Sequence, residues 1–87
     1  MYTGTTKSGF AFEIEETALD NMELVDALAE AEEDPLSLSR VVRLLLGKED
    51  RKRLYNHIRT EQGNVPIDAM SEELKQIFAA CGTAGKN

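Results

Sequence analysis

The side chains with the clearest chemical potential gather between positions 48 and 59 of this 87-residue chain. This stretch holds the single histidine, His57, and five basic residues, which are Lys48, Arg51, Lys52, Arg53 and Arg59. Basic residues on one face of a helix can bind the phosphates of a nucleic acid or the carboxylates of an acidic protein. The same pattern is typical of a solvated helix face that pairs with acidic neighbours.

The distribution of charge argues against nucleic acid as the partner. The net charge is -6, with -9 in residues 1–34, +5 in residues 35–60 and -2 in residues 61–87. The first third would repel a phosphate backbone, whereas it can pack against the basic middle third of its own chain. We therefore favour the solvated face. A small helical nucleic-acid-binding or regulatory domain that uses the basic helix 48–59 is the alternative.

The other reactive residue types give no pattern of an enzyme. His57 has no second histidine or cysteine at ligand spacing, and zinc needs at least three protein ligands. Cys81 falls on an apolar helix stripe, which favours a small buried hydrophobic residue over a nucleophile. The six glycines are scattered and form no phosphate-binding loop. We expect no catalytic, cofactor-binding or metal-binding residues.

The elements that position these residues begin with a hairpin over residues 5–16. Phe10, Phe12 and Ile14 alternate with smaller or charged residues, as in a strand with one covered face. Ser8 and Gly9 suit the turn, because glycine readily takes a positive φ. An isolated hairpin is marginally stable, so helices should cover its apolar face.

Four helices are predicted to follow the hairpin. The first runs from Asp20 or Asn21 to about residue 32, and the second covers 36–46 and ends at Gly47 in a left-handed C-cap. The third covers about 49–59, and the fourth covers about 66–80 and ends at Gly82. The fold class is therefore mainly α, a four-helix small domain with a short N-terminal β-hairpin. One domain spans 1–82, and 83–87 form a flexible tail.

The order of three segments resembles a known family. KSGFAFEIEE, NMELVDALAEAEEDPLSLSRVVRLLLG and RLYNHIRTEQGNVPIDAMSEELKQIF follow one another along residues 7–80. This order is similar to that of the small tail assembly chaperones encoded by long-tailed bacteriophages and prophages of Gram-positive bacteria. The resemblance rests on the pattern of segments and on no catalytic signature.

The resemblance implies a non-enzymatic role and a set of partners. Such chaperones bind the tape measure protein, keep it soluble and help to recruit subunits of the major tail tube protein. They act in the host cytoplasm and are absent from the mature virion. No apolar run long enough for a membrane span and no signal peptide is found, and a single cysteine suits a reducing compartment.

A programmed frameshift near the end of the gene makes a longer product in this family. Residues 85–87, Gly-Lys-Asn, can be encoded by an A-rich run on which ribosomes slip. Other codons encode the same residues, so an ordinary polar terminus is at least as good an interpretation.

The partner surface predicted from the sequence is apolar and charged rather than a pocket. It combines the exposed remainder of the second helix with a basic strip, and its residues are Arg40, Val42, Arg43, Leu45, Arg51 and Lys52. The many leucines of the second helix also leave open self-association into a dimer or ring.

Overall fold

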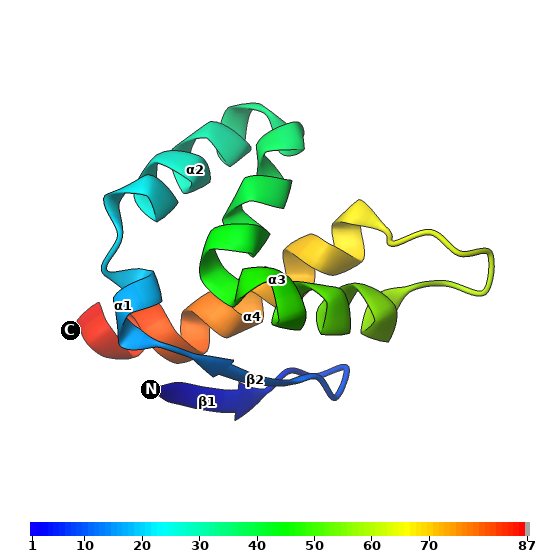
Figure 1. Ribbon diagram of the computed structural model, residues 1–87, viewed down its shortest axis with the longest axis horizontal. Helices are drawn as coiled ribbons and strands as arrows, with labels where there is room; N and C mark the ends of the chain where they lie inside the picture. The colour runs from blue at the N-terminus through cyan, green and yellow to red at the C-terminus, as the bar shows by residue number, and fades with distance from the viewer. Residues whose placement is uncertain (87) are drawn as a thin grey trace.

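The structure, a computed structural model, describes residues 1–86, with side chains for residues 1–81. It is mainly α with a two-stranded N-terminal hairpin, as the sequence predicts (Figure 1). The elements in chain order are β1 Tyr2–Thr5, β2 Ala11–Ile14, α1 Glu16–Leu19, α2 Met22–Glu33, the 3-10 turn η1 Pro35–Ser37, α3 Leu38–Ile58 and α4 Ile67–Lys86.

The hairpin pairs β1 and β2 antiparallel, with Tyr2 opposite Ile14 and Thr5 opposite Ala11. Its first strand begins earlier than the predicted residues 5–16. Gly9 has a φ of +97° in the connecting loop, so the expected role of this glycine is confirmed. The alternation is confirmed as well, because Phe10, Phe12 and Ile14 are all buried.

The acidic helix α2 begins where the sequence places it. Asn21 lies outside the helix, and its side-chain oxygen accepts a hydrogen bond from the amide of Glu23 at 3.0 Å. This bond satisfies one of the free amides at the helix start. The stripe turned to the core contains the buried Leu24 and Ala27, which lie three residues apart on one face of the helix. The short helix α1 before it is not predicted by the sequence analysis.

The predicted second and third helices are two halves of α3 separated by Gly47. This glycine has φ +80° and ψ 178°, a conformation that is essentially confined to glycine. The break falls at the predicted residue, but the ψ angle is extended rather than that of a left-handed helical C-cap. The two halves consequently run in clearly different directions (Figure 1). The turn η1 precedes α3, with the side chain of Asp34 capping the amide of Leu36 at 3.1 Å.

The last helix is longer than predicted, because α4 continues past Gly82 to Lys86. A glycine inside a helix costs only about 0.8–1.0 kcal/mol relative to alanine, so it does not by itself end the helix. The predicted tail 83–87 overlaps this helix, and its last residue, Asn87, lies outside the described residues.

One apolar core joins these elements. The hairpin lies along one side of α4, and α2 lies at the far end of the molecule, where it packs mainly on η1 and α3 (Figure 1). The buried apolar residues are Phe10, Phe12, Ile14, Leu24, Ala27, Val41, Val42, Leu45, Leu46, Leu54, Met70, Leu74, Ile77 and Cys81. None of the described helices is both long and apolar enough to span a membrane.

Candidate interaction surface

Part of the basic cluster holds the chain's own structure together. The guanidinium of Arg53 donates to Asp50 at 2.9 Å and to the carbonyl of Ala11 at 2.6 Å, and it lies 4.8 Å from the centre of the Phe10 ring. Arg59 donates to the carbonyl of Gly63 at 2.8 Å and so fixes the loop before α4. These two arginines therefore tie α3 to the hairpin and to a loop.

The predicted partner residues that carry charge are spread over both halves of α3. On the first half, Arg40 forms an ion pair with Glu30 of α2 at 3.3 Å, and Arg43 is exposed. On the second half, Lys52 is exposed and the guanidinium of Arg51 lies 6.0 Å from the centre of the Tyr55 ring. The bend at Gly47 separates the two pairs, so they do not follow one straight helix face.

The predicted apolar part of this surface is wrong. Val42 and Leu45 were expected to remain exposed, yet their relative accessibilities are 1% and 3%. The first half of α3 is the central element of the fold, and neighbouring elements cover it on more than one side. The wide apolar face that suggested a partner surface is therefore used in the core.

His57 belongs to a polar cluster at the tip of the hairpin. Its Nε2 atom lies 3.0 Å from Oγ of Ser8 and 3.1 Å from the Ser8 carbonyl oxygen. A carbonyl oxygen only accepts, so Nε2 carries the proton and donates. The Ser8 hydroxyl donates its own proton to Oε2 of Glu73 at 2.6 Å. We call Ser8, His57 and Glu73 the polar clasp.

The polar clasp fixes the hairpin rather than arranging a nucleophile. In acyl-transfer triads the histidine lies between the nucleophile and the carboxylate and accepts the nucleophile's proton. In the polar clasp the serine lies between the other two and the histidine donates. The amide of Lys7 adds a hydrogen bond to Gln76 on α4 at 2.7 Å. Glu73 is 4% exposed, and its Oε1 atom has no partner among the described residues.

Cys81 lies where its stripe on the helix predicts. The side chain is fully buried in the core, and burial raises the pKa of its thiol above the ordinary value. A raised pKa leaves little thiolate, which is the nucleophilic form. Within residues 1–81, no three His, Cys, Asp or Glu side chains come together in a way that could hold a metal ion.

An open apolar groove lies between α2, the start of α3 and α4, with a volume of about 850 Å³. We call it the central groove. Most of its lining side chains are apolar, with one acidic and one basic residue among them; the lining consists of Leu28, Ala31, Glu32, Leu38, Val41, Ser71, Leu74, Lys75, Phe78 and Ala79. The groove exists because α2 leans on α3 and η1 rather than on α4.

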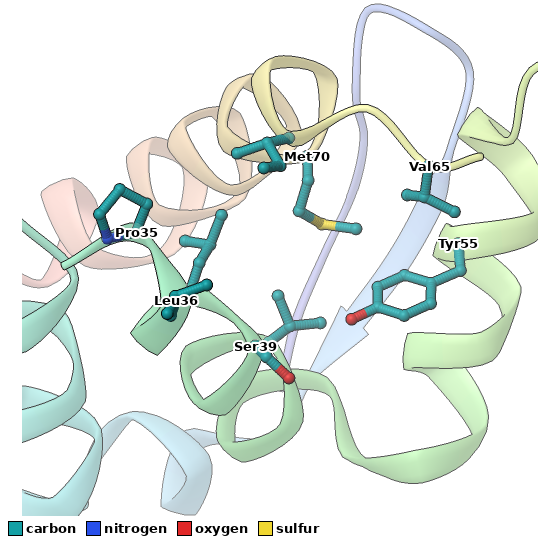
Figure 2. Close-up of a pocket in the computed structure, with 9 residues that line it drawn as sticks. Pro35, Leu36, Ser39, Tyr55, Val65 and Met70 are labelled. Atoms are coloured by element: carbon teal, nitrogen blue, oxygen red, sulfur yellow. The ribbon is translucent and has the colours of Figure 1, made fainter.

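A smaller cavity of about 300 Å³ also adjoins the start of α3 and shares Leu38 with the central groove. Figure 2 shows Pro35, Leu36 and Ser39 on one side of it and Val65 and Tyr55 on the other. Leu36 at its rim is 84% exposed. We call it the side cavity.

The central groove cannot be predicted from the sequence alone. Its walls come from residues about 40 positions apart, and the apolar stripe of α2 looks the same whether a helix of the chain or a partner covers it. The apolar side chains Leu28, Ala31 and Phe78 indicate the groove because they are only half-buried. Their partial exposure can be recognised only after α2 and α4 have been placed in the fold.

Comparison of the chain with known protein families, curated proteins and solved structures finds no match.

Proposed function

We propose that this chain is a tail assembly chaperone of a long-tailed phage or prophage, a non-catalytic protein that binds the tape measure protein in the host cytoplasm. The observation that carries the proposal is the central groove, an open and mostly apolar channel with helical walls. The identity of the partner comes from the resemblance in residues 7–80. The longer frameshifted form and the recruitment of tail tube subunits belong to the same proposal.

The chemistry of such a partner suits the groove. A tape measure protein is a long and mostly helical chain with apolar stripes that are uncovered before assembly. Amphipathic helices commonly bind by laying their apolar face in a hydrophobic groove. A small domain that covers one stretch weakly can protect the whole chain when many copies bind along it.

The alternative, a nucleic-acid-binding domain that uses residues 48–59, has less support. Arg53 and Arg59 make hydrogen bonds to carbonyl groups of the chain itself, so a phosphate would have to compete with these contacts. The net charge of -6 also opposes the approach of nucleic acid.

Co-expression tests the proposal. The tape measure protein encoded beside this chain should be insoluble alone, and it should become soluble and co-purify when this chain is produced with it. A tape measure protein that stays insoluble in both cases would contradict the proposal. An antibody against an N-terminal tag should also detect a minor longer product when the native gene is expressed with its downstream flank.

A further inference from the structure

We infer that the central groove binds one amphipathic helix, with a basic residue of that helix facing α2 and an acidic residue facing α4. The inference deepens the proposed function, on which it rests for its partner. It specifies the conformation, the orientation and the charge pattern of the segment that binds.

The spacing of the lining residues favours a helix as the occupant. On α4, Ser71, Leu74, Lys75 and Phe78 follow one another at intervals of three, one and three residues, and on α2 the pattern is Leu28, Ala31 and Glu32.

These intervals form the ridges by which helices pack on one another. The side chains of both walls can therefore pack against those of a third helix lying between α2 and α4.

The groove walls retain apolar surface that an occupant would cover. Leu28, Ala31 and Phe78 are only partly buried, although they adjoin the core. Removing apolar surface from water is favourable, so covering these side chains favours binding.

The two walls of the groove differ in charge. Glu32 lies on the α2 side and Lys75 on the α4 side, and both are exposed. Neither forms an ion pair within residues 1–81. Helix α2 has five acidic residues and no basic one, so its side of the groove attracts a positive charge. A bound amphipathic helix would therefore turn a basic flank toward α2 and an acidic flank toward α4.

A second copy of the chain is a poorer occupant than a different protein. Within residues 1–81, its large exposed apolar residues on α-helices are Met22 and Val25 on α2 and the single Ile67 on α4. Met22 and Val25 could enter a groove only by bringing one acidic α2 beside another, and one isolated side chain would cover little of the groove. Like charges placed together across an interface are unfavourable. The basic second half of α3 carries none of the large exposed apolar residues, which are Met1, Met22, Val25, Leu36 and Ile67.

The test uses the full chain labelled with nitrogen-15 and two synthetic helical peptides. Both peptides carry leucines at intervals of three and four. One has lysines on one flank and glutamates on the other, and the second has the same residues with both charges mixed on each flank. We expect amide shifts along the groove with the first peptide, and an affinity about two- to fivefold higher than that of the second peptide.

Neighbouring residues provide matched controls. Glu32→Arg should abolish the preference between the peptides, because the new positive charge on the α2 side opposes the attraction that Lys75 still supplies on the α4 side. Glu33→Arg makes the same change in charge outside the lining and should preserve the preference. Ala79→Glu should weaken both peptides at least tenfold by placing a carboxylate in the apolar channel, and Ala80→Glu on the same helix should not. All four positions are exposed, so the variants should keep the fold.

Several results would overturn the inference. Shifts concentrated around the side cavity would place the partner there, and groove shifts that grow with protein concentration without peptide would assign the groove to a second copy. Equal binding of both peptides by all variants would refute the charge pattern.

If the peptides bind as expected but the tape measure protein stays insoluble, the groove inference stands and the proposed function fails. If the Ala79→Glu variant still keeps the tape measure protein fully soluble, the proposed function stands and the groove inference fails.

Discussion

Replacing Ser8 by alanine should destabilise the protein by an amount set mainly by one hydrogen bond. The Ser8 hydroxyl is the donor to Oε2 of Glu73 at 2.6 Å, and the other oxygen of this buried carboxylate has no partner among the described residues. Ser8→Ala would leave both oxygens without a protein donor. Hydrogen bonds to charged groups contribute about 1.5–3 kcal/mol, and leaving a buried acceptor unsatisfied costs a similar amount.

The lower part of that range applies here. The hairpin tip is exposed, so water can replace the contacts of Ser8 with His57 and Thr6. We therefore expect a loss of about 1.5–2 kcal/mol in the free energy of unfolding. For a domain of this size, each kcal/mol corresponds to about 4–8 °C, which predicts a Tm lower by roughly 6–16 °C.

Urea unfolding followed by circular dichroism measures this loss, and Lys7→Ala is the control. Lys7 contacts Gln76 through its backbone amide, which an alanine retains. The decisive experiment repeats Ser8→Ala in a Glu73→Met background, where no buried carboxylate needs the hydroxyl. The cost should then nearly vanish, because replacing both partners by apolar groups can be almost neutral. An equal cost in both backgrounds would refute the reasoning.

Three further predictions concern other parts of the chain. Gly47→Ala should cost about 1–3 kcal/mol in urea unfolding, because its φ of +80° and ψ of 178° suit only glycine; a loss no larger than that of Lys48→Ala would contradict this. Cys81 should react with iodoacetamide only as the protein opens, because burial raises its thiol pKa. Since the folded thiol keeps its proton to higher pH than the unfolded one, its contribution to stability should be complete below the ordinary pKa of 9.0 and fall as the pH rises above it; Cys81→Val should remove that fall, and an unchanged alkaline profile would argue against it. Duplex DNA should show no salt-dependent change in fluorescence anisotropy with the protein, and such binding, if weakened by Lys52→Glu, would favour the alternative function.

Local signals were sufficient for most of the secondary structure. The alternation of Phe10, Phe12 and Ile14 predicts a covered strand face, and Asn21 and Gly47 mark helix boundaries through their own backbone and side-chain preferences. The end of α4 was predicted less well, because Gly82 weakens a helix without requiring it to stop.

Features that depend on how the helices pack were not predictable in the same way. The apolar run of α3 indicates burial, but not which of its faces are covered, so Val42 and Leu45 were assigned to the surface. Glu73 looks like any exposed carboxylate of an amphipathic helix until the hairpin tip is placed over it. The central groove likewise depends on the tilt of α2, which the sequence of α2 does not encode by itself.

The polar clasp also constrains the order in which the chain can fold as it is synthesised. Ser8 and Glu73 are 65 residues apart, and Lys7 and Gln76 are 69 apart. The hairpin is therefore synthesised first, but its hydrogen bonds to α4 can form only after α4 has been made. At about 5–20 residues per second, several seconds separate the synthesis of β2 from that of α4. During this interval the hairpin has no α4 beside it. The carboxylates of Glu13, Glu15 and Glu16, which are exposed in the fold, would then act as gatekeepers that keep two nascent hairpins from pairing.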